Sequence, residues 1–138
     1  MNKKIFIASD HAGYEMKTKL NDHFSSFIDL GTNSIDSVDY PDFAHKLTNE
    51  VLKNDESLGI LICGTGVGMS IAANRTIGIR AGLVNSVEVA RLIRQHNDAN
   101  VLVIPGRFMN DDEAKNCVKV FIDTQFEAGR HKKRVEKI

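Results

Sequence analysis

The sequence predicts an α/β fold, a single doubly wound domain with a five-stranded parallel sheet flanked by helices. Five apolar segments of strand length recur along the 138 residues, and a stretch of helical character follows each of them. The central apolar segments are nearly continuous in Ile, Leu and Val, which is typical of parallel strands covered on both faces. Strand–helix alternation repeated five times indicates right-handed crossovers in one sheet, a Rossmann-like arrangement.

The elements follow from local patterns taken in chain order. Strands are expected at residues 4–8, 27–30, 58–63, 79–84 and 100–104, and helices near 13–24, 41–54, 67–75, 86–96 and 111–126. Pro41 suits the first turn of a helix. Ser86 and Asn110 stand where helix caps are needed, with acidic residues following each of them. No internal repeat or linker interrupts the pattern, so residues 1–138 are interpreted as one domain.

Composition narrows the class of partner. Hydrophobic residues make up 42% and charged residues 26% of the chain, as in ordinary globular proteins. The 18 basic and 18 acidic residues cancel, so no overall field favours nucleic acid or a membrane surface. The charge is uneven, however, because residues 129–138 hold five basic residues and one acidic residue. This basic C-terminal tail suggests one local anionic partner.

Location is inferred from what the chain lacks. No apolar run approaches the ~20 residues of a membrane span, and the short apolar run after the first residues is interpreted as a strand rather than a signal peptide. Cys63 and Cys117 do not make a disulfide framework at this length. We therefore expect a cytoplasmic protein.

In doubly wound sheets, ligands bind beyond the carboxyl ends of the strands. That rule selects residues 9–11, 31–40, 63–68 and 106–107. The most specific of these segments is 63–68, CGTGVG, which closes a buried strand and opens a helix. Free amides at such a helix start favour negative charge. A dinucleotide site is disfavoured because Met69 stands where that motif needs glycine or alanine. The alternative is a turn that merely tolerates glycine.

Single side chains near these strand ends have two interpretations each. Cys63 is either a thiolate nucleophile or base, or a buried structural cysteine, whereas Cys117 is assigned to packing inside a helix. Asp10 either caps the next helix or points with His11 into the crevice. His23 and His45 are assigned to the surface, and the histidine spacing predicts no metal site.

His96 and the basic tail lie elsewhere in the predicted topology. His96 and Asn97 follow the fourth helix, at the amino end of the sheet, while a five-residue strand spans ~17 Å. His96 is therefore either a helix C-cap or a catalytic residue supplied by a second subunit across a two-fold interface. If the tail is helical, Arg130, His131 and Arg134 share one face. They form either a solvated surface or a grip for phosphate.

Taken together, these segments resemble the RpiB/LacAB family of sugar-phosphate isomerases. The matching stretches are SDHAG (9–13), GT (31–32), DYP (39–41), ICGTGVG (62–68), IAAN (71–74), QHND (95–98), NVL (100–102) and GRHKKR (129–134). They span nearly the whole chain in order. Some members of the family carry a glutamate where Met69 stands, so this chain is similar to the branch that uses the cysteine.

The resemblance implies interconversion of ribose 5-phosphate and ribulose 5-phosphate, a reaction of the pentose phosphate pathway, without metal or organic cofactor. Cys63 would be the base that moves a proton between C2 and C1, and His96, helped by Asn97, would open the sugar ring. Thr65 would assist proton transfer near the sugar oxygens, and the backbone amides of Gly64, Gly66, Val67 and Gly68 would stabilise the enediolate. Asp10 and Tyr40 would hold sugar hydroxyls. The phosphate would be held by His11, Arg107, Arg130 and Arg134, with His131 a weaker candidate.

The resemblance also implies a homodimer or homotetramer with active sites shared between subunits. Two other functions remain open on the sequence. One is isomerisation of a hexose 6-phosphate, of the galactose or allose type, by the same residues. The other is a sugar-phosphate-binding module without catalysis, which would not need Cys63 or His96.

Overall fold

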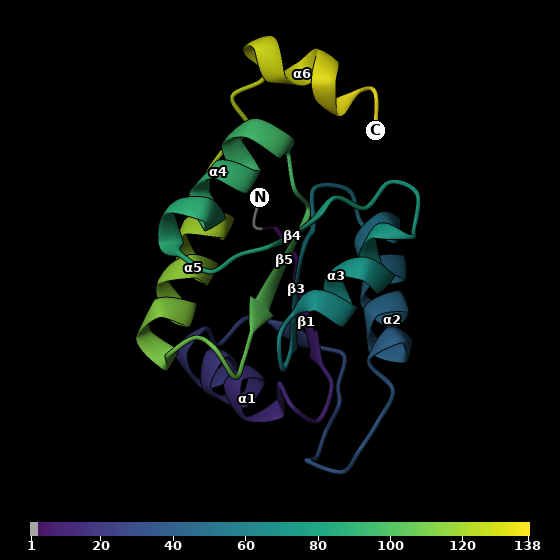
Figure 1. Cartoon of the computed structure of the whole chain (residues 1–138), viewed down its shortest axis with the longest axis vertical. Coiled ribbons are helices and arrows are strands. Elements are labelled where there is room, and N and C mark those ends of the chain that lie inside the picture. The colour runs from purple at the N-terminus through teal and green to yellow at the C-terminus, as the bar shows by residue number, and fades with distance from the viewer. Residues whose placement is uncertain (1–2) are drawn as a thin grey trace.

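The computed structural model describes residues 3–138 (Figure 1). Its strands are β1 (Ile5–Ser9), β2 (Ile28–Asp29), β3 (Leu58–Cys63), β4 (Ala81–Leu83) and β5 (Val101–Pro105). Its helices are α1 (Tyr14–His23), α2 (Tyr40–Lys53), α3 (Val67–Asn74), α4 (Val87–Asn97), α5 (Asp111–Asp123) and α6 (Gly129–Val135). All five predicted strands and all five predicted helices are present, and the basic tail adds α6.

The strands form one parallel sheet in the order β2-β1-β3-β5-β4. The order reverses between β1 and β3, where Ser9 pairs with Ile62 at the carboxyl ends of both strands. Cys63 pairs in turn with Pro105 of β5. The loops after β1, β3 and β5 therefore meet at one edge of the sheet, which confirms the predicted α/β fold and its switch point.

Helices cover both faces of this sheet, because alternate residues of each strand point to opposite sides. One core packs β1, β3 and β5 against α1, α4 and α5, and includes Ile7, Leu20, Ile60, Leu102 and Phe121. The other packs the same strands against α2 and α3, and includes Phe6, Leu47, Leu61, Met69 and Val103. Figure 1 shows the two helix layers on either side of the sheet. Each fully buried large apolar side chain contributes roughly 1.5–3 kcal/mol.

Local capping matches the sequence pattern. The Ser86 hydroxyl accepts a hydrogen bond from the Val89 amide at 3.2 Å, and the Asn110 side chain accepts one from the Glu113 amide at 2.8 Å. Pro41 lies in the first turn of α2. These contacts satisfy amides that have no partner within the helix, and they fix where α4 and α5 begin.

The C-terminal helix α6 lies away from the carboxyl ends of the strands. In Figure 1 it crosses the end of α4, while the arrowhead of β5 points in the opposite direction. The segment before α6 is held to α4 by a hydrogen bond from the Glu127 amide to the Gln95 carbonyl at 3.1 Å. No helix within residues 3–138 has the length and apolar character needed to cross a membrane.

Candidate active site

The residues singled out from the sequence lie in two groups. The first surrounds the carboxyl-end crevice, the space where the loops after β1, β3 and β5 meet; its members are Asp10, His11, Tyr40, Cys63, Gly64, Thr65, Gly66, Val67, Gly68 and Arg107. The second lies where α4 and α6 meet, and comprises His96, Asn97, Arg130, His131 and Arg134. The two groups occupy opposite ends of the sheet within one chain (Figure 1).

The loop after β3 presents a thiol beside free backbone amides. Cys63 is the last residue of β3 and is 5% exposed. Gly66 has a φ of +81°, a left-handed conformation that glycine adopts without strain. The Thr65 hydroxyl accepts a hydrogen bond from the Val67 amide at 3.2 Å, so its proton is free to donate. Within residues 3–138, the Gly68 and Met69 amides at the start of α3 have no hydrogen-bond acceptor.

Arg107 lies across this loop. Its amide donates to the Gly64 carbonyl at 3.0 Å, which ties the loop after β5 to the loop after β3. Its guanidinium Nη1 lies 3.3 Å from the point that a Cβ atom on Gly64 would occupy. Glycine at position 64 therefore lets an exposed cation approach the amides beside Cys63. Arg107 and Cys63 belong to the same half of the site.

Tyr40 reaches the same loop from the first turn of α2. A Cβ atom on Gly68 would lie 2.6 Å from the Tyr40 ring, which is closer than any real contact. Glycine at position 68 therefore allows the phenol ring to pack against the start of α3. Tyr40 remains 40% exposed, so it borders the crevice rather than filling it.

Asp10 and His11 follow β1 and are held in different ways. The Asp10 carboxylate is 6% exposed and accepts a hydrogen bond from the Gly13 amide at 3.0 Å through Oδ1. Asp10 thus binds the residue just before α1, whose first turn has no side-chain cap, and its second oxygen has no protein donor within the described chain. His11 Nδ1 accepts a hydrogen bond from the Val38 amide at 3.2 Å, so a neutral ring carries its proton on Nε2.

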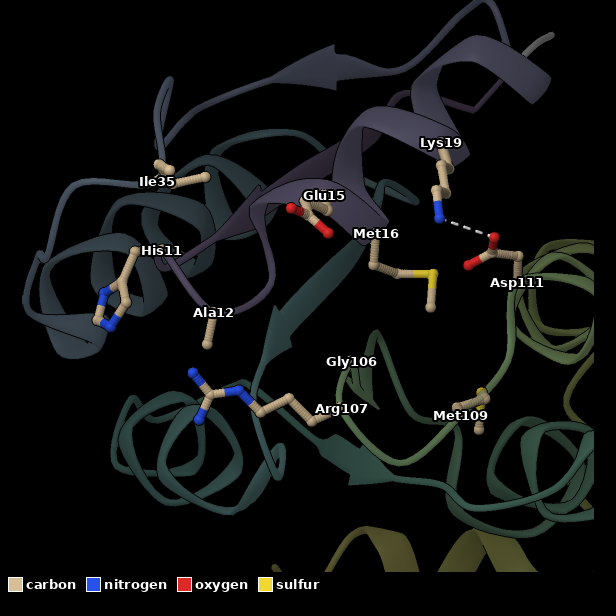
Figure 2. A pocket seen from close by; sticks show the side chains of 10 residues that line it. All are labelled: His11, Ala12, Glu15, Met16, Lys19, Ile35, Gly106, Arg107, Met109 and Asp111. Carbon is tan, nitrogen blue, oxygen red and sulfur yellow. Dashed lines mark ion pairs between the residues drawn. The ribbon is translucent and has the colours of Figure 1, made fainter.

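His11 and Arg107 also border a pocket of about 420 Å³ between the loop after β1, α1 and the loop after β5. In Figure 2 the His11 ring and the Arg107 guanidinium lie on one side of this pocket. On the other side Lys19 pairs with Asp111 at 2.9 Å, an ion pair that raises the pKa of Lys19 through the hydrogen bond and charge of Asp111. The pocket is thus an extension of the carboxyl-end crevice, and His11 and Arg107 lie where the two spaces meet.

At the other end of the sheet His96 stacks on His131, with ring centroids 4.3 Å apart and ring planes 16° from parallel. Both Nε2 atoms face Glu127, at 4.0 Å for His96 and 3.7 Å for His131. Burial lowers the pKa of His131, and the nearby His96 and Arg130 lower it further. His96 thus lies at the amino end of the sheet, as the topology predicted, and the tail is helical.

Sequence reasoning missed Glu127. Its contact with His131 has a sequence signal, since the two residues are four apart at the start of a helix. Its contact with His96 has none, because it depends on how the segment before α6 packs on α4. Three placements predicted from the sequence are confirmed: His23 and His45 are exposed, and Cys117 is fully buried in α5.

Comparison with known proteins supplies the family. The sequence model described as "Ribose/Galactose Isomerase" matches residues 5–138. The chain is 47% identical over 144 residues to the probable ribose-5-phosphate isomerase B of Mycoplasma genitalium, covering 100% of this chain and 95% of that protein. It is 43% identical over 140 residues to ribose-5-phosphate isomerase B of Escherichia coli strain K12, covering 99% and 94%.

Solved structures agree with these relatives. The crystal structure of a ribose 5-phosphate isomerase from Thermotoga maritima has a TM-score of 0.96 and 48% identity, covering 99% of this chain and 97% of that one. The Mycoplasma genitalium enzyme with bound ribulose-5-phosphate has a TM-score of 0.95 and 47% identity, covering 99% and 94%. Sequence, fold and coverage together show that this chain belongs to the ribose/galactose isomerase family.

Proposed function

We propose that this chain is an aldose–ketose isomerase that interconverts ribose 5-phosphate and ribulose 5-phosphate. The observation that carries the proposal is the grouping of a thiol, free amides and two phosphate-binding side chains around one crevice. Cys63 ends β3 beside the unpaired amides of Gly68 and Met69, and His11 and Arg107 border the same crevice. Relatives at 43–49% identity over nearly their whole length carry the name of this enzyme.

Proton transfer is assigned to Cys63. Its thiolate takes the proton from C2 of the open-chain aldose, which leaves an enediolate spread over C1, C2 and their oxygens. Return of the proton to C1, with transfer of the O2 hydroxyl proton to O1, completes the ketose. The Thr65 hydroxyl and the Gly68 and Met69 amides donate to the enediolate oxygens; preorganised donors of this kind are worth about 2.7–4 kcal/mol each.

Substrate binding is assigned to side chains that stand back from the thiol. Asp10 has one carboxylate oxygen left for a sugar hydroxyl, and Tyr40 borders the loop on its other side. His11 donates to the phosphate through Nε2, and Arg107 adds a full positive charge. Because the phosphate is remote from the reacting carbons, its binding energy is available to orient C1 and C2 against Cys63.

Ring opening is assigned to His96, with Asn97 beside it, acting in the crevice of a second copy of the chain. Within one chain Cys63 ends β3, whereas His96 lies in the last turn of α4, before β5 begins, so the two residues lie at opposite ends of the sheet and a single protomer does not bring them together. The subunit that supplies His96 also supplies Arg130 and Arg134 of α6, which complete the phosphate site, with His131 as a weaker contributor. The proposal is therefore a homodimer with two shared sites, or a tetramer built from such dimers.

Exposed apolar side chains next to the crevice support a partner surface. Val67 and Ile71 of α3 are 49% and 57% exposed, and Leu83 at the end of β4 is 38% exposed.

We place the reaction in the cytoplasm, because Cys63 and Cys117 are both free thiols and a reducing compartment keeps them so.

Steady-state kinetics on three substrates test the function. Ribose 5-phosphate is expected to give a kcat/KM at least about tenfold above those for galactose 6-phosphate and allose 6-phosphate, since an extra carbon in a fitted pocket costs roughly 1–3 kcal/mol. A preference for either hexose phosphate would replace the pentose assignment with a hexose one. Tight binding of all three substrates without turnover would indicate a binding module.

A further inference from the structure

The histidine cluster, defined as His96, His131 and Glu127, has the composition of a metal site. One potential ligand atom from each residue lies within 4.8 Å of the other two. The two Nε2 atoms are 4.0 Å and 3.7 Å from Glu127 Oε1, which is too long for hydrogen bonds between them. The three side chains therefore lie close together without hydrogen bonds to one another.

These separations suit a tetrahedral ion. A zinc–nitrogen bond is about 2.0–2.1 Å, so two neighbouring ligands of tetrahedral zinc lie roughly 3.4 Å apart. The two nitrogen-to-oxygen separations exceed this spacing by about 0.3 Å and 0.6 Å, and no two of the ligand atoms are more than 4.8 Å apart. Two imidazoles with one carboxylate favour Zn²⁺ and related transition metals over Mg²⁺ and Ca²⁺, which prefer oxygen ligands.

The backbone brings the three ligands together before any ion binds. His131 is 8% exposed and stacks on His96 with ring planes 16° from parallel, so one ring turns out of the stack to aim its Nε2 lone pair at a shared ion. The backbone at Glu127 is fixed to Gln95, the neighbour of His96, by a 3.1 Å hydrogen bond. Preorganisation of this kind lowers the entropic cost of closing three ligands around an ion.

The surroundings leave room for a further ligand. A cavity of about 310 Å³ adjoins the cluster and is lined by Asn97 and Arg134 among others. Water or a substrate oxygen has space there as a fourth ligand.

We propose that His96, His131 and Glu127 bind a transition-metal ion of the Zn²⁺ class, and that the bound ion withdraws His96 from ring opening. The ion occupies the Nε2 lone pair that would otherwise carry the proton given to the ring oxygen. Only this inhibitory consequence rests on the proposed function, because the binding itself requires no turnover.

Zinc affinity measured by competition with a chromophoric chelator tests the binding. One equivalent per chain is expected, with Glu127→Gln weakening it at least about tenfold. Glu136→Gln removes a carboxylate from the turn that ends α6 and serves as the matched control, with unchanged affinity. Because thiols also bind zinc, Cys63→Ser is measured too and is expected to bind as the unmodified chain does. Equal affinity in Glu127→Gln, or loss of binding in Cys63→Ser, would overturn the site.

Cobalt(II) gives an independent view of the ligands. The Co²⁺-loaded chain is expected to show the visible bands of nitrogen and oxygen ligands and no thiolate-to-cobalt charge-transfer band. A charge-transfer band would place the ion on a cysteine and contradict the assignment. Neither measurement depends on catalysis, so both decide the metal site even if the isomerase assignment fails.

Inhibition is tested separately. For each variant, the turnover rate with zinc is compared with the rate of the same variant when a chelator removes the zinc. Zinc is expected to slow ribose 5-phosphate turnover reversibly, and Glu127→Gln to need about tenfold more zinc for half inhibition. Half inhibition of Glu127→Gln at the same zinc concentration as the unmodified chain would show that zinc acts elsewhere.

Discussion

His11 Nδ1 accepts a hydrogen bond from the Val38 amide at 3.2 Å, which joins the loop after β1 to the loop before α2. The contact has two consequences. It fixes the ring, and it leaves the Nε2–H of the neutral imidazole to donate into the crevice. A single histidine thereby holds the loop before α2 and presents the donor that the proposed function assigns to the phosphate.

Replacing His11 separates these two tasks. Asn keeps an acceptor near the position of Nδ1 and removes the Nε2 donor, so His11→Asn is expected to preserve the loop and lose the phosphate contact. A hydrogen bond to a charged group is worth about 1.5–3 kcal/mol, which predicts a KM for ribose 5-phosphate raised roughly tenfold or more. Steady-state kinetics measure it, with exposed His23→Asn as control. An unchanged KM would remove His11 from the phosphate site.

Cys63→Ala tests the base. General bases contribute typically about 10²–10⁴-fold, so kcat is expected to fall by at least about 100-fold. The Kd for ribitol 5-phosphate, which has the phosphate and no carbonyl, is expected to stay within about threefold because the phosphate contacts are remote from C2. Exchange of the C2 proton with deuterated water, followed by NMR, reports the step directly. Persistent exchange would assign the base to another group.

Mixing two inactive variants tests the shared site. In a two-fold dimer, a Cys63→Ala subunit paired with a His96→Ala subunit has one doubly defective site and one intact site. Random exchange of equal amounts makes half of the dimers mixed, so about a quarter of the unmodified activity is expected to return. Each variant exchanged with itself is the control. No recovery, with mixed dimers verified by native mass spectrometry, would contradict catalysis by His96 in its partner's crevice.

The sequence predicted one half of the site better than the other. Cys63 ends the apolar run at 58–63, and Asp10 stands just after the one at 4–8. The hydrophobic pattern and the order of elements along the chain therefore place both residues at strand ends without knowledge of packing. Strand order is different, because two segments become neighbours only through the path of the crossovers, and β5 lies between β3 and β4. The meeting of His96 with Glu127 depends in the same way on packing between distant segments.

Lys17 shows the same limit for the core. A lysine in the middle of an amphipathic helix is normally exposed, yet Lys17 is 1% exposed and its ammonium contacts both oxygens of Asp29 at 2.7 Å and 2.8 Å. Asp29 also accepts a hydrogen bond from the Gly31 amide at 2.9 Å. The partner lies on β2, a strand of only two residues, whose pairing with β1 brings it to α1.

Asp29→Ala tests this buried pair. The substitution leaves the Lys17 ammonium without its counter-charge, and breaking a buried pair costs about 3–5 kcal/mol. Because the Asp29 side chain is 35% exposed, water screens part of this cost, and a loss of about 2–3 kcal/mol in unfolding free energy is expected. Urea unfolding measures it. Lys19→Ala, which removes an exposed ion pair on the same helix, is expected to change stability little; equal effects of the two variants would contradict the burial argument.

The buried thiol of Cys117 is expected to make the folded chain less stable at alkaline pH. Burial, with the nearby Glu113, raises the pKa of this thiol from 9.0 to about 11. Between these values the unfolded chain releases the proton and the folded chain keeps it, so the unfolding free energy falls as the pH rises from about 9 to 11. The contribution is about 1–3 kcal/mol. Urea unfolding at pH 8 and pH 10.5 is therefore expected to show a smaller loss for Cys117→Ala than for the unmodified chain, and comparing the two chains removes the effect of other groups that titrate in this range. Equal losses in both chains would show that Cys117 ionises alike in the folded and unfolded states.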